Sequence, residues 1–272
     1  MVLEDLTQPP GQRLAAFGMS VFVTPAFMAS AKRGSVPGLA AEVARAILAG
    51  ETSVLETEAV RRANSGPGLN LLVLHYAEAP RDPTPERLGE VRAKQVETFF
   101  FVHGGYRFAK MLVEHRDDHL RQFSLEGGFE IRSEYDSYFH GSPRPPSPRP
   151  ILLGITREET LPHPGWHVAR LFLYTPPRFH FKPQEQALLW RALLDETDDE
   201  IAAALFLSVN TVKKRWTGIY ERVTNIAPAL LFPEPPDTTP NEPRRGLEKR
   251  RHLLRYLRLY PEELRPTLPP AL

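Results

Sequence analysis

The chain has 272 residues, of which 42% are hydrophobic and 25% are charged, so it is long enough for one large or two ordinary globular domains. It contains no cysteine, which excludes disulfides, thiolate metal sites and cysteine nucleophiles. Its formal net charge of +1 lacks the excess of cations that is typical of nucleic-acid-binding proteins. A nucleic-acid-binding surface would therefore have to come from an uneven distribution of charge.

No apolar run is long enough to span a membrane. Residues 1–13, MVLEDLTQPPGQR, are acidic and contain proline where a signal peptide would be basic and then apolar. We therefore expect a cytoplasmic location and no membrane partner.

Prolines divide the chain, because each one removes a backbone donor and disfavours helix in the residue before it. They cluster in GSPRPPSPRP (141–150) and again in FPEPPDTTPNEP (232–243). We expect the first cluster to be a loop inside an N-terminal domain and the second to be a linker.

The segments around the first proline cluster predict a mixture of strands and helices. Residues 17–23 and 69–76 are short apolar or β-branched runs bounded by glycine or proline, which is typical of strands. Residues 39–50 predict a helix that ends at Gly50. Residues 149–159 predict a strand, and residues 167–179 predict either a strand or a short helix that ends before Pro176. An α/β or α+β N-terminal domain is the expected fold.

Residues 90–116 fit two patterns. Apolar side chains at helical spacing favour one long helix, although Gly104 and Gly105 interrupt it. The alternative is a strand, FFFVH, then a diglycine turn and a helix, YRFAKMLVEH. That order resembles the acyl-CoA-binding strand, loop and helix of GNAT acetyltransferases, in which backbone N–H groups at a helix N-terminus hold a pyrophosphate. The chain departs from the family's glycine pattern at residues 107–109, and we favour a packed helix or turn.

The sequence carries no pattern typical of a catalytic or metal site. It has neither a G-x-S-x-G elbow nor a Walker-type phosphate loop. His115 and His119 are four residues apart, but no third ligand is indicated, and surface histidines explain them better. We therefore expect no cofactor, no metal and no enzyme activity, with an acyltransferase-like N-terminal domain as the alternative.

Residues 182–224 predict three short amphipathic helices in close succession. Pro183 suits a first helical turn, and Thr197 with Glu200 forms a capping box. Any of Ser208, Asn210 and Thr211 could cap the third helix. Acidic residues predominate from 185 to 200 and cations from 211 to 222, so the third helix is basic. If its apolar residues face the core, Lys213, Lys214 and Thr217 lie on the exposed side.

This segment, EIAAALFLSVNTVKKRWTGIYERV, resembles the LuxR-type (GerE-type) helix-turn-helix, whose pattern includes E-I-A-x-x-L, S-x-x-T-V-K and an ending like I-Y-x-K-L. The match runs without a gap through ten positions: Glu200, Ile201, Ala202, Leu205, Ser208, Thr211, Val212, Lys213, Ile219 and Tyr220. The resemblance implies a transcription regulator that binds double-stranded DNA as a homodimer, with RNA polymerase as a further possible partner. Pro228 interrupts the family's fourth helix, which commonly makes the dimer contact.

The resemblance also implies roles for individual residues. A recognition helix at about 211–223 would insert into the major groove and read it with Lys213, Lys214 and Thr217. Ser208, Asn210 and Thr211 would contact phosphates or cap the helix. Val212 and Trp216 would remain in the core.

A basic segment, 244–266, follows the second proline cluster. One interpretation is a helix that adds contacts to the DNA backbone through Arg244, Arg245, Lys249 and Arg251. The other is a solvated helix that packs its leucines on the protein.

The predicted domains are therefore 1–180, a sensory or interaction domain; 181–231, the helix-turn-helix; 232–246, a linker; and 247–265, a basic helix. The first predicted strand lacks the acidic pair of a phosphorelay receiver, so we expect an unknown effector to act on the N-terminal domain.

Overall fold

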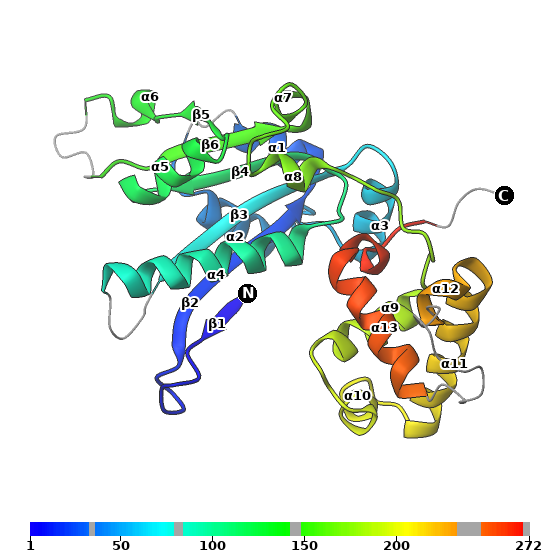
Figure 1. The fold of residues 1–272 in the computed structure, drawn as a ribbon. Coiled ribbons are helices and arrows are strands. Elements are labelled where there is room, and N and C mark those ends of the chain that lie inside the picture. The colour runs from blue at the N-terminus through cyan, green and yellow to red at the C-terminus, as the bar shows by residue number, and fades with distance from the viewer. Residues whose placement is uncertain (33–35, 79–83, 142–147, 233–245, 269–272) are drawn as a thin grey trace. The chain divides into compact units, whose positions relative to one another are not determined.

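The computed structural model describes residues 1–32, 36–78, 84–141, 148–232 and 246–268. It divides into two compact units, Met1–Tyr174 and Thr175–Leu272. The first is built on a sheet and the second consists of helices (Figure 1). The mixed α/β character expected of the N-terminal part is confirmed.

A six-stranded sheet forms the centre of the first unit. Its spatial order is β1-β2-β3-β4-β6-β5, and its pairs are antiparallel except for the parallel pair β3–β4. The strands are β1 (Val2–Glu4), β2 (Leu14–Val23), β3 (Leu69–Glu78), β4 (Phe108–His115), β5 (Glu130–Ser133) and β6 (Ile151–Thr156).

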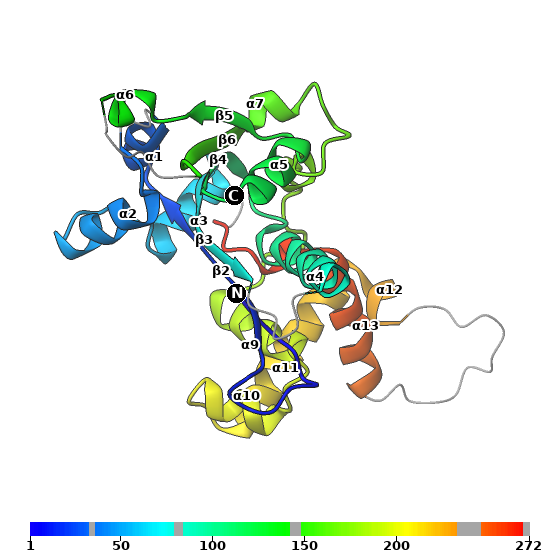
Figure 2. The same cartoon turned by 90° about the vertical axis from the view of Figure 1, so that its left-hand side faces the viewer.

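Eight helices of the described residues belong to this unit: α1 (Pro25–Lys32), α2 (Leu39–Leu48), α3 (Thr57–Ser65), α4 (Pro85–His103), α5 (Asp118–Glu126), α6 (Asp136–Phe139), α7 (Arg157–Thr160) and α8 (Ala169–Phe172). They cover both faces of the sheet. Leu72, Leu112 and Leu152 pack on one face with residues of α1, α2 and α6. Their neighbours Leu71 and Met111 pack on the other face, which α4 and α5 cover (Figure 2). This alternation follows from the two-residue period of a strand.

Most short-range predictions in this unit are confirmed. The strands at 17–23 and 69–76 are β2 and β3, the helix at 39–50 is α2, and the strand within 149–159 is β6. Gly50 has a φ of +74°, which suits its place directly after a helix. Within 167–179 the short helix, α8, was the correct alternative.

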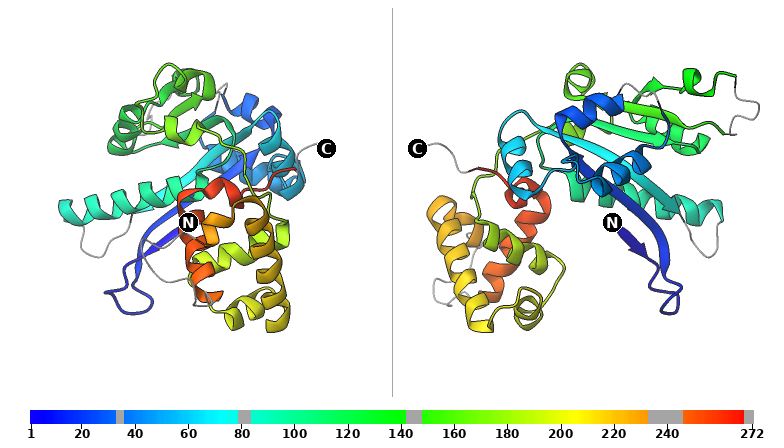
Figure 3. Two further views of the ribbon diagram at one scale, coloured as in Figure 1. Left: turned by 45° about the vertical axis from the view of Figure 1, so that its right-hand side comes forward. Right: turned by 180° about the vertical axis from the view of Figure 1, so that it is seen from behind.

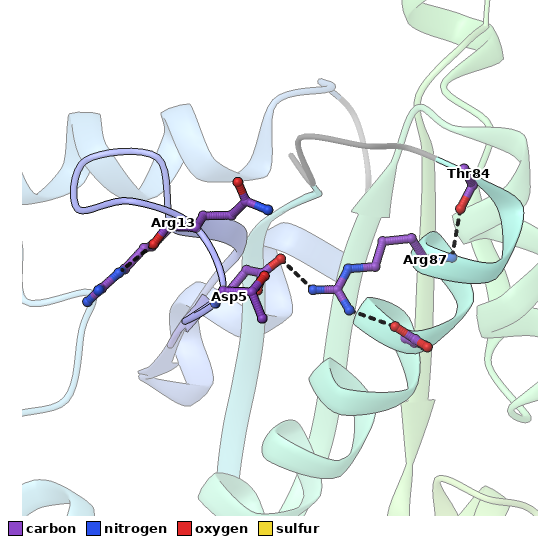
Figure 4. Close-up of polar contacts among 7 residues, drawn as sticks. Asp5, Arg13, Thr84 and Arg87 are labelled. Carbon is purple, nitrogen blue, oxygen red and sulfur yellow. Dashed lines mark hydrogen bonds and ion pairs between the residues drawn. The ribbon is translucent and has the colours of Figure 1, made fainter.

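Each prediction for residues 90–116 was wrong in part: the long helix forms only as far as His103, and the strand, turn and helix of the alternative do not form. The helix α4 contains FFFVH and ends at His103, before Gly104, and the segment predicted as helix forms the strand β4 instead. Thr84 caps α4, and its first turn pairs Arg87 with Asp5 of the loop after β1 (Figure 4). β4 forms because it pairs with β3 on one side and β6 on the other, and residues 107–109 therefore start a strand. The order strand, loop, helix that suggested acyl-CoA binding is absent from these residues.

His115 ends β4 and His119 lies in α5, so they do not share a helix face.

The second unit consists of α9 (Pro183–Leu193), α10 (Asp198–Ala204), α11 (Val209–Ile226), α12 (Pro228–Leu231), α13 (Gly246–Leu259) and a 3₁₀ turn, η1 (Pro261–Leu264) (Figure 3). The three helices predicted from 182 to 224 are confirmed as α9, α10 and α11. Thr197 and Glu200 form the predicted capping box, and Ser208 caps α11. The helix α12 begins at Pro228 and is a single turn.

Candidate nucleic-acid interface

Helix α11 buries one stripe and exposes the opposite side. Val212, Ile219 and Val223 have no exposed surface, and Trp216 is 5% exposed. They pack against residues of α9, α10 and α13 in one core. Lys213, Lys214 and Thr217 are exposed, as the helical spacing predicted.

A tight turn joins α10 to α11. The N–H of Leu207 donates to the carbonyl of Ala202 at 2.8 Å, which closes the turn. Phe206 occupies the left-handed region with a φ of +54°, and its side chain is 96% exposed. Phe206 stands two residues before the cap residue Ser208, and the sequence analysis missed its exposure because the position matches an ordinary apolar one.

Hydroxyl groups organise the first turn of α11. The Oγ of Ser208 accepts a hydrogen bond from the N–H of Thr211 at 3.2 Å and lies 2.9 Å from the Oγ1 of Thr211. The Oγ1 of Thr217 donates to the carbonyl of Lys213 at 3.2 Å, which leaves the lone pairs of its oxygen available. Asn210 is exposed in the first turn of α11, with Ser208 and Thr211. Three of the predicted site residues therefore gather at the helix N-terminus.

The ammonium groups of Lys213 and Lys214 make no ion pair with any residue from the described ranges. Other cations of the unit do: Arg222 pairs with Glu185 at 3.3 Å, and Arg258 pairs with Asp195 at 3.1 Å. The first turn of α11 contains no acidic residue. The two lysines therefore place uncompensated positive charge next to the positive end of the helix dipole.

Arg250 of α13 connects three elements. Its Nη1 donates to the Oδ1 of Asp198 at 2.9 Å, and its Nη2 donates to the carbonyl of Glu196 at 2.7 Å. Its guanidinium lies 4.9 Å from the ring centroid of Trp216, whose Nε1 donates to the same Asp198 oxygen. The sequence analysis did not assign this role, because the partners are at least 34 residues away along the chain.

The leucines of α13 belong to the core of the second unit. Leu253 and Leu257 have no exposed surface, and Leu254 is 7% exposed. This bears out the packing interpretation of the basic segment. Among the auxiliary candidates, Lys249 holds its Nζ 4.6 Å from the ring centroid of Phe232, and Arg251 is exposed. Arg244 and Arg245 lie outside the described residues.

Glu263 is buried in η1 and connects this turn to the segment before α9. Its carboxylate accepts hydrogen bonds from the N–H groups of Arg178 and Phe179 and from the hydroxyl of Tyr256. Burial raises the pKa of this carboxyl above its ordinary value, against the effect of these donors. The segment after α13 is therefore attached to the segment before α9.

Comparisons of the chain with protein-family models, with curated proteins and with solved structures find no match. The resemblance at 182–224 rests on the residues quoted above. Over the ranges that the structure describes, no helix has the length and apolarity needed to cross a membrane. The same ranges hold no group of three or more histidine and acidic side chains arranged to bind a metal.

Proposed function

We propose that the chain is a transcription regulator that binds double-stranded DNA through a LuxR-type helix-turn-helix, with α11 as the recognition helix. The observation that supports this most is the pair of exposed lysines, Lys213 and Lys214, without an acidic partner in the described ranges and opposite the buried stripe of α11.

The shape and charge of this helix suit the major groove. The groove admits an α-helix, and recognition helices contact base edges with residues near their N-termini. Lys213, Lys214 and Thr217 would reach bases or phosphates from the exposed side. Ser208, Asn210 and Thr211 would lie close to the backbone, where helix N–H groups also attract phosphate.

In this proposal a homodimer binds two half-sites, and the first unit responds to an effector that changes DNA affinity. Because α12 is one turn long, its surface is small, and the dimer contact is proposed without assignment to an element. RNA polymerase is a further partner in the proposal. Arg251, and Lys249 if it leaves Phe232, would add contacts that are independent of sequence.

The test is selection of bound sequences from random double-stranded DNA by the full-length protein, followed by affinity measurements across a salt series. The variant combines Lys213→Ala with Lys214→Ala. The control combines Arg45→Ala with Arg62→Ala, which removes two exposed helix cations from the first unit.

We expect the wild type and the control to select one motif and the lysine variant to lose it. If both ammonium groups contact phosphates, the negative slope of log K against log salt becomes shallower by about 1.8 in the lysine variant, since each phosphate contact contributes about 0.9. If they contact bases, affinity for the motif falls while the slope changes less. A motif kept by the lysine variant would contradict the assignment of α11. Binding that shows no motif and is unchanged in the lysine variant would instead favour the basic residues of α13 as the DNA contact.

A further inference from the structure

Two arginines of the first unit carry charge that no acidic side chain pairs with. Arg107 directly precedes β4, and Arg157 is the first residue of α7. Both side chains are partly buried, yet neither makes an ion pair with an acidic residue in the part of the chain that the structure describes. Arg132, by contrast, pairs with Glu130 and Glu159. Buried charges in proteins are normally paired, so two partly buried charges without a partner need an explanation.

The guanidinium of Arg157 is only partly satisfied by the protein. Its Nε donates to the carbonyl of Phe108 at 2.8 Å, whereas its Nη2 is enclosed and has no hydrogen-bond partner. Nη2 meets neither water nor a ligand, so the positive charge that it shares with the other two nitrogens is poorly solvated. Nη1 also lacks a partner among the described residues, but it is not one of the enclosed atoms. Nη1 is therefore the atom of Arg157 that is open to an anion.

Arg107 places a second positive charge close to the first. The carbonyl that Arg157 contacts belongs to Phe108, the residue directly after Arg107, so both arginines lie at the same end of β4. Burial lowers the pKa of Arg157, and the charge of Arg107 lowers it further. Glu158 acts in the opposite direction, but its side chain is exposed and forms no ion pair with either arginine in the described ranges. The two guanidinium groups therefore repel each other without a carboxylate between them.

We propose that Arg107 and Arg157 together bind the doubly charged phosphate group of a small phosphate monoester. The N–H groups of arginine match phosphate oxygens, and such charge-assisted hydrogen bonds are stronger than neutral ones. The guanidinium of Arg107 lies 5.7 Å from the ring centroid of Tyr174 and makes no side-chain hydrogen bond within the described ranges, so its N–H groups can serve a ligand. A dianion offsets both positive charges, whereas a carboxylate or a phosphodiester offsets one. The proposal concerns the first unit and does not depend on DNA binding by the second.

The test titrates the full chain, without DNA, with methyl phosphate and with dimethyl phosphate at about pH 7.5 and constant ionic strength. The monoester is close to doubly charged under these conditions, because its second pKa is about 6, and the diester carries one charge. Binding is followed by two-dimensional ¹H–¹⁵N NMR, which also reports whether each variant is folded. Arg107→Met and Arg157→Met each remove one positive charge, and the first leaves the hydrogen bond from Arg157 to Phe108 in place. The control is Arg45→Met, which removes an exposed charge from α2.

We expect methyl phosphate to bind the wild type saturably, each of the two site variants to weaken this binding about tenfold or more, and Arg45→Met to leave it within about twofold. Dimethyl phosphate should bind the wild type about tenfold more weakly. The absence of saturable binding to the folded wild type would overturn the proposal, and so would an Arg107→Met variant that binds methyl phosphate as tightly as the wild type. Equal affinity for the two esters would also overturn it and would indicate a contact with a phosphodiester backbone. Because DNA is absent, each of these results leaves the proposed regulator function untouched.

Discussion

Helix α13 should contribute directly to the stability of the second unit, and two leucines on it provide a matched comparison. Leu257 has no exposed surface and packs in the same core as Val212 and Trp216, whereas Leu259, two residues later, is 70% exposed. Replacing a fully buried leucine by alanine costs about 2–5 kcal/mol, through lost burial and the cavity that remains. Replacing an exposed one changes stability by about 0.5 kcal/mol or less. We expect Leu257→Ala to cost about 3 kcal/mol of unfolding free energy and Leu259→Ala almost nothing.

The assay is denaturant unfolding of the full chain followed by tryptophan fluorescence. A Trp166→Phe background leaves Trp190 and Trp216, both in the second unit, as the reporters. The midpoint should fall for Leu257→Ala with an unchanged slope, which marks a change in stability alone. Equal midpoints for the two alanine variants would refute the conclusion that α13 is part of this core.

Two further outcomes are expected. Burial lowers the pKa of His115 from 6.5 to about 4 in the folded chain, so the unfolded chain binds more protons between these values, and stability falls as pH drops through that window. The loss approaches about 3 kcal/mol, and urea unfolding at pH 7 and pH 4.5 should show a smaller loss for His115→Asn than for the wild type. An equal loss would contradict the assignment to His115. Ser208→Ala should cost about 1 kcal/mol by removing the cap of α11, whereas Ser208→Asp keeps a capping oxygen and should retain stability. If α11 faces phosphates, Ser208→Asp should nevertheless weaken DNA binding by charge repulsion, and unchanged affinity in low salt would count against that placement.

Some elements were predictable because their signals are local. Two of these signals, the capping box of Thr197 and Glu200 and the buried stripe of α11, involve residues three or four positions apart. A third is the single residue Pro183, which begins α9. Helix formation depends on such neighbours, so the sequence alone was sufficient. The exposed side of α11, with Lys213 and Lys214, followed from the same periodicity.

Other features were decided only when distant segments met. The run from Phe99 to His115 has apolar residues that fit a helix or a strand, and pairing with β3 and β6 made its second half a strand. The partners of Arg250 likewise depend on which elements pack together.

The sequence by itself thus determined the helices α9, α10 and α11 and which side chains of α11 face outward, because both depend on contacts within a few residues. The tertiary structure alone decided the strand β4 and the place of α13 in the core. These depend on hydrogen-bonding and packing partners that the chain brings together only when it folds.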